Sequence, residues 1–384
     1  MRIQLSEHFT YRKLLRFTLP SVIMMVCTSI YGVVDGVFVS NFVGSDAFAA
    51  VNLIMPFLMV LGAVGFMLGT GGSALVAYTL GAGNEKRANE IFSLLIYVLI
   101  GVGAVFTIGG IAFLTPMSRL LGADETMLPV CVSYGRIVLL GLIPYMLQNT
   151  FQSFLVTAER PQLGLYVTIA AGVTNIALDA LFVAVLQWGA EGAALATILS
   201  QFVGGAIPLV YFLRPNSSKL RLGRTAFHGR ALLKACANGS SEFMTNISMS
   251  VVNMLYNWQL MRLMGSGGVA VYGVIMYVNF IFIAIFLGYS MGSAPIVGYH
   301  YGAGNRAELR GLLRKSLCII TVMSVVLTAA ALLLARPLSM IFMSKEATLL
   351  PVTIRAFSIY SLSFLMAGYN IYASSFFTAL NDGF

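Results

Sequence analysis

The chain has 384 residues, of which 58% are hydrophobic and only 10% are charged, and its mean hydropathy is +0.87. A water-soluble domain carries about 25% charged residues because its surface must be hydrated, so this composition excludes a soluble protein. The four cysteines form no CxxC pair and the three histidines are scattered. The sequence therefore predicts neither a disulfide framework nor a metal cluster.

Ten mainly apolar stretches are each long enough to cross a bilayer, which takes about 20 residues in a helix. They cover residues 16–40, 50–79, 91–114, 129–157, 163–186, 191–213, 239–264, 270–300, 316–335 and 351–378. The first stretch is too long for a signal peptide and lacks a clear small-residue cleavage site, so we expect it to remain in the mature protein. The sequence thus predicts an all-α, multi-pass membrane protein.

The formal net charge of +9 follows from the topology. Lys and Arg resist translocation and collect on the cytoplasmic side of a membrane. If the N-terminus lies in the cytoplasm, most of the 23 basic residues fall on the inner side. We therefore expect a membrane protein with a cytoplasmic N-terminus and no nucleic-acid partner. The basic run at residues 214–230 is then a cytoplasmic linker, with contact to anionic lipids as an alternative.

An internal repeat appears when the chain is shifted on itself by 221 residues. The shift places Gly44 on Gly265, Ala49 on Ala270, Gly71 on Gly292, Tyr78 on Tyr299, and the GAGN motif at 81–84 on that at 302–305. At nearly the same offset, FLVTAE at 154–159 pairs with FFTALN at 376–381. Six spans separate the copies, so both insert with the same orientation about an axis along the membrane normal. This predicts two pseudo-symmetric lobes that face each other across a cleft.

The repeat also sets the expected domain boundaries. We predict an N-terminal lobe of six spans at residues 1–213, a basic linker at 214–235 and a C-terminal lobe at 236–384. The first copy continues through two more spans after FLVTAE, whereas the second has only about four of its six helices. We expect the chain to be a C-terminally truncated fragment of a protein of about 440 residues, judged from the length of the complete copy.

Acidic side chains inside the spans are the main functional signal. A charge at the centre of a membrane costs about 2.5 to 3.5 kcal/mol or more, so such residues are functional candidates. Asp35 lies in the first span, Asp179 in the fifth, and Glu242 at the start of the seventh. Asn175 precedes Asp179 by four residues and so shares its helical face, and Thr197 lies on the sixth span.

Burial disfavours the ionised form of a carboxyl group, and carboxylate, amide and hydroxyl oxygens suit a small hard cation. The two aspartates can therefore hold a proton or a metal cation and exchange it for another positive charge. The alternative is that Asp35 and Asp179 only hydrogen-bond to neighbours and fix helix register. For Glu242, a position near a helix N-terminus would by itself favour an anion.

The fourth span carries a polar stripe made by Tyr134, Gln148, Asn149 and Gln152 around Pro144. Proline in a spanning helix frees backbone groups and permits bending where a cavity is lined. The stripe is therefore a candidate cavity wall, with a simple packing kink as the alternative.

No nucleotide motif accompanies these residues. The GAGN motifs lack the third glycine and the preceding strand of a dinucleotide fingerprint, and no GxxxxGK[ST] occurs. We therefore expect no enzyme activity and no cofactor, with the energy supplied by an ion gradient.

These motifs together resemble a known family. IYGVVDGVFVSNFVG at 30–44, NIALDALF at 175–182, GAALATILSQ at 192–201 and the two GAGN motifs are similar to those of the MATE (multidrug and toxic compound extrusion) transporters. GSSEFMTNISMSVVNMLYN at 239–257 resembles the MepA-like branch. The resemblance implies a MATE fold of two six-helix lobes, both termini inside, and export of cationic drugs in exchange for H⁺ or Na⁺.

The resemblance also assigns site residues. It places the coupling-cation site, a Na⁺ site if transport is sodium-coupled, on Asp35, Asn175, Asp179 and Thr197. It places the lining of the substrate cavity on Tyr31, Tyr134, Asn149 and Gln152, with Glu242 as a further contact.

Together with the resemblance, the sequence indicates a monomeric multidrug antiporter of the bacterial inner membrane that binds small organic cations and is surrounded by membrane lipids. The alternative is a lipid-linked saccharide flippase of related two-lobe architecture, which would need a more basic cleft for its pyrophosphate headgroup. A scaffold or receptor would not require paired aspartates within one helix bundle.

Overall fold

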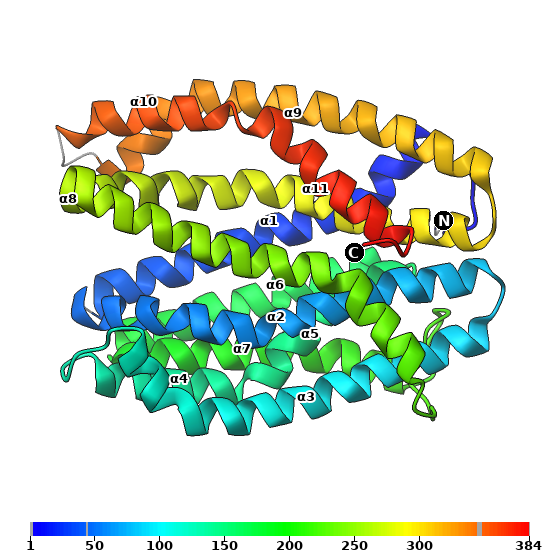
Figure 1. Cartoon of the computed structure of the whole chain (residues 1–384), viewed down its shortest axis with the longest axis horizontal. Helices are drawn as coiled ribbons and strands as arrows, with labels where there is room; N and C mark the ends of the chain where they lie inside the picture. Colours follow the sequence, from blue (N-terminus) through cyan, green and yellow to red (C-terminus); the bar gives the residue numbers. More distant parts are fainter. Residues whose placement is uncertain (1–2, 44, 344–347, 384) are drawn as a thin grey trace.

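The computed structural model describes residues 3–43, 45–343 and 348–383. Within these residues the regular structure consists of twelve helical elements and no strand (Figure 1). They are α1 (Tyr11–Phe42), α2 (Ser45–Gly81), α3 (Glu85–Leu120), α4 (Leu128–Leu140), α5 (Leu142–Thr157), α6 (Pro161–Asp179), η1 (Ala180–Val185), α7 (Gly189–Leu213), α8 (Gly229–Gly302), α9 (Arg306–Met343), α10 (Leu349–Ser361) and α11 (Phe364–Ala379). The predicted all-α class is confirmed.

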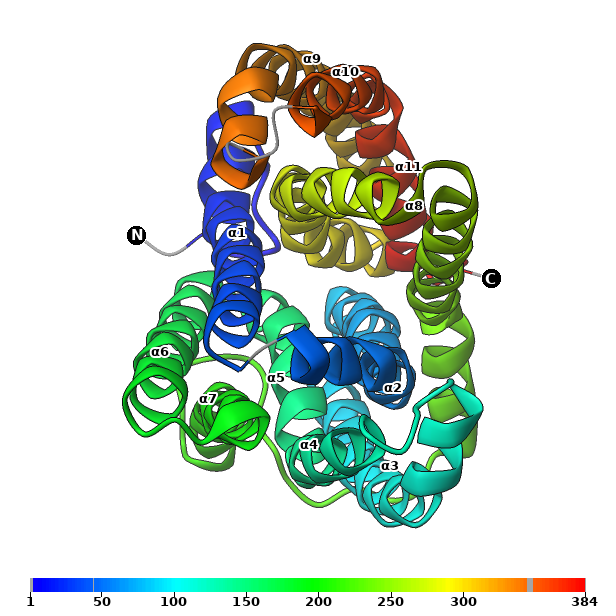
Figure 2. The same ribbon diagram turned by 90° about the vertical axis from the view of Figure 1, so that its left-hand side faces the viewer.

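The helices form two lobes. Viewed along the bundle, α2 to α7 gather on one side and α8 to α11 on the other, with α1 running between them (Figure 2). The first lobe has a large apolar core that joins α2, α3, α4 and α5, and a second core joins α8, α9 and α11 to the start of the chain. This arrangement confirms the predicted two-lobe fold, in which the second lobe has fewer helices.

Nearly all of the expected membrane spans are present. Within the described part of the chain, seven helices are long and apolar enough to cross a membrane, or up to nine if each of two bent pairs counts as one span. The stretch at 239–264 makes up the difference from the ten expected spans. It is helical but is not among these nine, because polar residues such as Asn253, Asn257 and Arg262 dilute its apolar character.

Element α8 consists of two antiparallel arms, and we call residues 229–264 the first arm and residues 266–302 the second arm. Gly265 separates them with φ 66° and ψ −155°, a conformation that only glycine adopts readily. Figure 1 shows α8 running to one end of the bundle and turning back.

Two expected single spans are bent at equivalent places. The axes of α4 and α5 differ by 52° at Gly141, and those of α10 and α11 differ by 46° just after Ser361. Pro144 explains the first break, because it has no N–H to donate to the preceding turn. The second break has no proline nearby, so the local residue type does not explain it. It lies at the position that the repeat pairs with Gly141.

The repeat is visible in the backbone of the GAGN motifs. Gly83 and Gly304 both have positive φ, at 80° and 68°. In each motif the asparagine that follows caps the next helix: Asn84 Oδ1 accepts the N–H of Arg87 at 3.0 Å, and Asn305 Oδ1 accepts that of Glu308 at 3.1 Å. In each motif the glycine with positive φ therefore ends one helix, and the asparagine caps the start of the next.

The second matched signature has the same conformation in both copies. Glu159 and Asn381 end the paired FLVTAE and FFTALN segments, and their φ angles are 61° and 59°. Positive φ is uncommon outside glycine, so its recurrence at matched positions supports the repeat. Gly44, which the repeat pairs with Gly265, lies outside the described residues.

Contacts between the lobes repeat as well. Gly71 of α2 packs against the first arm of α8, so that a Cβ on it would lie 2.5 Å from the Gly239 nitrogen. Gly292 of the second arm packs in the same way against α1, where a Cβ would lie 3.0 Å from the Thr18 Cα. Both pairs are related by the offset of the repeat, since 292 − 71 and 239 − 18 are each 221. The pseudo-symmetry thus extends to the interface between the lobes.

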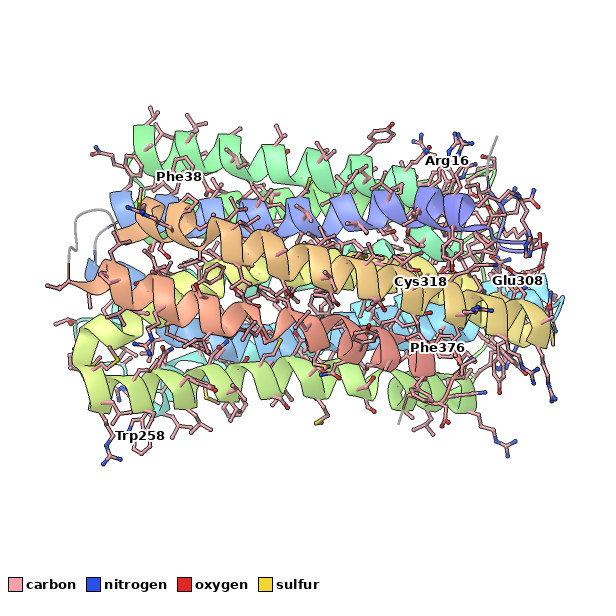
Figure 3. The ribbon with its side chains drawn as sticks, turned by 90° about the horizontal axis from the view of Figure 1, so that it is seen from above. Arg16, Phe38, Trp258, Glu308, Cys318 and Phe376 are labelled. Atoms are coloured by element: carbon pink, nitrogen blue, oxygen red, sulfur yellow. The ribbon has the colours of Figure 1, made fainter. Side chains whose placement is uncertain are left out.

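The two ends of the bundle differ in chemistry. Figure 3 shows Arg16 and Glu308 at one end and Phe38 and Trp258 at the other. We call the first the basic end, because it carries the starts of α1, α3 and α9 and the Arg- and Lys-rich segment at 214–228.

Candidate cation site

The two predicted aspartates meet between α1 and α6. Their carboxyl groups lie close enough to interact electrostatically, although no hydrogen bond of ordinary geometry joins them. Asp179 is fully buried, and neither of its carboxylate oxygens has a hydrogen-bond partner in the described part of the chain; the same holds for Asp35 Oδ1. Buried polar atoms without partners are costly and rare. The pair is therefore suited to take up a positive charge.

The other two predicted ligands lie on α6 and α7. Asn175 is buried one helical turn before Asp179. Thr197 lies on α7, which packs along α6 and η1, and its buried Oγ1 has no hydrogen-bond partner in the described part of the chain. The structure thus brings Asp35 and Asp179 together, with Asn175 on the same helix. It shows no hydrogen bond from the Thr197 hydroxyl to either carboxyl group among the described residues.

A π-helix that no sequence pattern indicated follows Asp179 directly. Residues Ala180–Val185 form η1, whose wider turn continues α6. Such turns are rare and occur frequently at functional sites. Asp179 is 18 residues from Pro161 along α6, so it lies about 27 Å from the basic end at 1.5 Å per residue. The pair is therefore in the half of the bundle farther from the basic end.

A glycine on α6 permits the close approach of α1. A Cβ on Gly172 would lie 3.0 Å from Cδ1 of Tyr31, which is one turn before Asp35. The Tyr31 hydroxyl accepts a hydrogen bond from Gln148 Nε2 of α5 at 3.5 Å. Tyr31 is thus held between α5 and α6, beside the carboxyl pair.

The predicted cavity residues divide into two kinds. Tyr134 of α4 is buried, interacts electrostatically with both aspartates, and directs its hydroxyl to Met55 Sδ at 4.0 Å. Gln152 is also buried, and its Nε2 has no partner in the described part of the chain. Asn149, by contrast, donates to the carbonyl of Tyr145 in its own helix at 3.0 Å. Gln152 therefore has a buried amide nitrogen available to a ligand, whereas the Tyr134 hydroxyl and the Asn149 amide already have partners.

The expected position of Glu242 near a helix N-terminus is wrong. Element α8 begins at Gly229, so Glu242 lies several turns inside the helix, beyond the first turn in which the helix dipole acts. Its side chain is partly buried in the second lobe, and no hydrogen bond or ion pair joins it to the aspartates in the described part of the chain. The helix dipole therefore does not explain this carboxyl group.

One residue near the aspartates was missed by sequence reasoning. Tyr277 of the second arm of α8 interacts electrostatically with Asp35, and a Cβ on Gly36 would lie 3.6 Å from its hydroxyl. The second lobe therefore reaches the first-lobe carboxyl pair. No local pattern around Tyr277 could have indicated this, because the contact depends on how the lobes pack.

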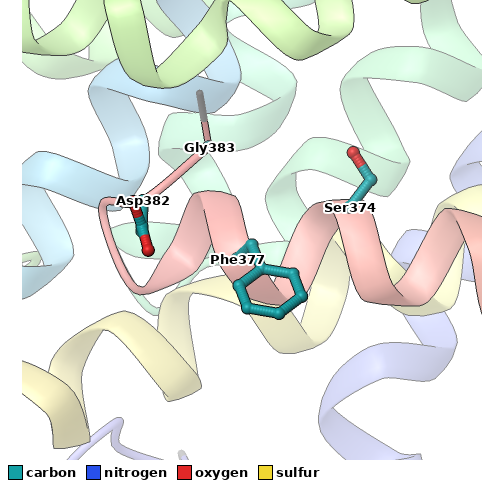
Figure 4. Close-up of a pocket in the computed structure, with 4 residues that line it drawn as sticks. All are labelled: Ser374, Phe377, Asp382 and Gly383. Atoms are coloured by element: carbon teal, nitrogen blue, oxygen red, sulfur yellow. The ribbon is translucent and has the colours of Figure 1, made fainter.

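Two surface depressions lie away from the pair. One of about 400 Å³ is lined by Ser374, Phe377, Asp382 and Gly383 at the end of α11 (Figure 4). Another of about 260 Å³ lies between α3 and the segment at 214–228. Neither includes a predicted site residue. No group of three or more His, Cys, Asp or Glu side chains that could hold a metal ion occurs among the described residues.

The model of the MatE family matches residues 20–181 and 243–383, which is most of the chain and includes both lobes. The chain belongs to the MatE family. It is therefore a multi-pass membrane transporter and not an enzyme.

Two relatives from staphylococci match most of the chain. The chain is 23% identical over 370 residues to the multidrug export protein MepA of Staphylococcus haemolyticus strain JCSC1435, covering 94% of this chain and 81% of that protein. It is 22% identical over 367 residues to MepA of Staphylococcus aureus strain NCTC 8325, covering 93% and 80%. The predicted resemblance to the MepA-like branch is confirmed.

Solved MATE structures share the fold. A MATE crystal structure in complex with MaL6 matches with a TM-score of 0.93 at 22% identity, covering 98% of this chain and 84% of that chain. A multidrug resistance MATE family transporter in an outward-facing conformation matches with a TM-score of 0.91 at 23% identity, with the same coverage. The MatE-family chain therefore has the MATE fold.

Proposed function

We propose that this MatE-family chain belongs to a multidrug antiporter that exports small organic cations in exchange for H⁺ or Na⁺ by alternating access of the cleft between its lobes. The observation that carries the proposal is the pair Asp35 and Asp179, in which both oxygens of Asp179 and Oδ1 of Asp35 are buried and lack hydrogen-bond partners among the described residues. The export names of the staphylococcal relatives agree with it. No prosthetic cofactor is needed for such an exchange.

The carboxyl pair supplies the coupling. Two like charges at close range inside a low-dielectric bundle repel, so one proton or small cation between them lowers the free energy of the site. A proton needs only the two carboxyl groups. Na⁺ would draw its further oxygen ligands from Asn175 and Thr197. A cationic substrate competes for the same negative charge, so binding of the ion favours release of the substrate.

The substrate side of the site is proposed from the same region. Tyr31 and Tyr134 offer aromatic surface beside the pair, and aromatic faces attract organic cations. Gln152, one turn after Gln148 on α5, adds a buried amide nitrogen without a partner in the described part of the chain. Asn149 and Glu242 remain proposed contacts. Glu242 would add a second-lobe carboxylate that a substrate reaches when it lies between the lobes.

The orientation is proposed from charge. The basic end would face the cytoplasm, because Lys and Arg collect there. The carboxyl pair would then lie nearer the outer face, where an inward gradient supplies the ion. We retain the lobe boundaries at 213 and 236 and the monomeric state as proposals.

Asparagine variants test the proposal. Asp35→Asn and Asp179→Asn remove one negative charge each with little change in volume. In proteoliposomes with an imposed proton or sodium gradient, we expect either variant to lower efflux of a cationic dye at least about 100-fold, as the loss of an essential buried charge predicts. Glu125→Gln is the matched control, because that side chain is exposed in the loop after α3.

The outcomes separate the parts of the proposal. Efflux driven by one gradient and not by the other names the ion. Unchanged efflux in both asparagine variants would reject coupling through the pair. Efflux of an anionic lipid-linked sugar in place of the dye would favour a flippase.

A further inference from the structure

Two polar segments at the basic end each attach to the lobe opposite the helix that they lead into. Residues 3–10 precede α1 and bind α9 of the second lobe. Residues 214–228 precede α8 and bind α3 of the first lobe. The starts of α3 and α9, at Glu85 and Arg306, are 221 residues apart, so the two attachments occupy equivalent places of the repeat.

The first attachment is centred on one carboxylate. Glu308 Oε1 accepts the backbone N–H of Phe9 at 2.9 Å, and its Oε2 lies 2.6 Å from His8 Nδ1. Lys315, further along α9, donates its ammonium group to the carbonyl of Phe9. Hydrogen bonds to charged groups are stronger than neutral ones. Residues 8 and 9 are therefore firmly bound to the second lobe.

The same segment also contacts the first lobe. Leu5 donates its N–H to Glu159 Oε1 at 2.9 Å, at the end of α5. The Leu5 and Phe9 side chains are almost completely buried, in a cluster that contains Val156 of the first lobe and Leu312 of the second. The segment thus lies between the lobes, and a glutamate of each lobe accepts one of its backbone N–H groups.

The second attachment joins main-chain groups of the segment to side chains of α3. The N–H of Arg221 donates to Asn89 Oδ1 at 2.6 Å, and that of Gly223 donates to Ser93 Oγ at 3.0 Å. The Tyr97 hydroxyl donates to the Gly223 carbonyl at 3.1 Å. Three successive turns of α3 therefore hold the segment that leads into α8.

A histidine and a glutamate meet at this second attachment too. His228 Nε2 lies 3.7 Å from Glu90 Oε2 directly before α8 begins, as His8 meets Glu308 shortly before α1 begins. Lys219 links the two attachments: its ammonium group lies 3.7 Å from Glu159 Oε1 and 5.6 Å from the centre of the Tyr299 ring in the second lobe.

We propose that residues 3–10 and residues 214–228, here named the first and second clasps, hold the lobes together at the basic end and release when the cleft opens there. The reason is mechanical, because each clasp leads into a helix of one lobe and is hydrogen-bonded to a helix of the other. The first clasp leads into α1 and bonds to α9, and the second leads into α8 and bonds to α3. Separation of the lobes at this end breaks those bonds. Glu308 and His8 are then positioning residues that set the population of the closed state. This inference rests on the proposed antiport, in which the cleft between the lobes opens alternately to either side of the membrane.

Distance measurements between spin labels test the clasps in the whole chain. The four cysteines are unpaired, so they can be replaced and single cysteines placed at the exposed, equivalent positions Glu85 and Arg306 for labelling. Glu308→Ala removes the acceptor of the first clasp. We expect the population with a longer distance between labels to rise about tenfold, because lost bonds to a charged group bias a two-state equilibrium by that order. Glu125→Ala, in an exposed loop, is expected to leave the distances unchanged.

A second pair of variants protects the test against misfolding. His8→Ala removes one partner of Glu308 and leaves the buried Phe9 bond in place, so a smaller shift in the same direction is expected. Asn89→Ala should produce a similar shift through the second clasp. Distances that stay at the parent values in all three clasp variants would overturn the inference.

The readout is independent of transport. The label distances are measured without substrate and without an ion gradient. A shift in a protein that moves no dye would therefore support the clasps and count against the proposed function. Normal dye efflux without any shift in the distances would support the proposed function and count against the clasps.

Discussion

Gly81 lies directly against the carbonyl oxygen of Tyr299 in the other lobe, so close that a Cβ on it would be 1.9 Å from that oxygen. The relationship is reciprocal, because a Cβ on Gly302 would be 2.0 Å from the carbonyl oxygen of Tyr78. Gly81 and Gly302 are the first residues of the two GAGN motifs, and both tyrosines stand three residues before them. The lobes therefore touch backbone to backbone at the basic end, which only glycine allows.

A methyl group at this contact should disfavour the closed basic end. Gly81→Ala and Gly302→Ala force a Cβ into the facing backbone, and overpacking costs about 1 to 3 kcal/mol. Cysteines at Tyr78 and Tyr301, whose rings lie 5.5 Å apart, should cross-link at least about fivefold more slowly in either variant. Gly101→Ala is the control, because no atom lies within 4 Å of its added Cβ. Equal cross-linking rates in all variants would show that the contact does not limit closure.

A bulky residue between α1 and α6 should disable the carboxyl pair. Gly172→Leu would displace the Tyr31 ring, which is already 3.0 Å from an ideal Cβ, and so move Asp35 away from Asp179. A misplacement of about 1 Å is enough to lower activity about 100-fold in a preorganised site. We expect dye efflux to fall by that order. Gly109→Leu, which faces open space, should transport normally; a loss of efflux there would assign the effect to membrane insertion.

Asn238 should contribute to the stability of the basic end. Its buried side chain donates to the carbonyl of Thr378 at 2.8 Å and accepts the N–H of Gly383 at 3.0 Å. Asn238→Ala leaves these groups unpaired, which costs about 1 to 3 kcal/mol. Thermal unfolding in detergent should therefore occur at a lower temperature than for the parent chain. Asn257→Ala, at an exposed position of α8, should unfold with the parent, and an equal loss in both variants would contradict the assignment.

Glu242→Gln should change substrate binding and leave ion coupling intact. The variant removes a second-lobe charge that no described hydrogen bond connects to Asp35 or Asp179. We expect the KM for a cationic dye to rise about tenfold, the order expected for loss of one partly buried ion pair, with the choice of driving ion unchanged. A neutral substrate should show no change in KM. Loss of gradient dependence in this variant would instead place Glu242 in the coupling site.

Local features of the fold were predictable from the sequence because they depend on neighbouring residues. The GAGN motifs form their turns through the φ of Gly83 and Gly304 and the capping by Asn84 and Asn305, all within a few positions. The bend at Gly141 was indicated by Pro144, although only the structure shows that it divides the expected span. The matching bend after Ser361 has no local signal.

The candidate site was predictable in its residue types and not in its geometry. Asp35 and Asp179 are recognisable because charged groups are rare in apolar spans. Their meeting depends on the packing of α1 against α6, and the π-helix after Asp179 and the approach of Tyr277 depend on the packing of whole lobes. For Glu242 the expected helix start was wrong. Because α8 begins at Gly229, the helix dipole does not explain why this carboxyl group is there.

The sequence by itself determined that the chain lies in a membrane, that it contains a repeat, and which family it resembles, since hydropathy, spacing and motifs are properties of consecutive residues. Only the tertiary structure decided which residues meet across the lobes. His8 and Glu308 are 300 positions apart, and Gly81 meets Tyr299 only because two copies of one bundle face each other. Such contacts arise from the relative placement of rigid helices, which no local pattern encodes.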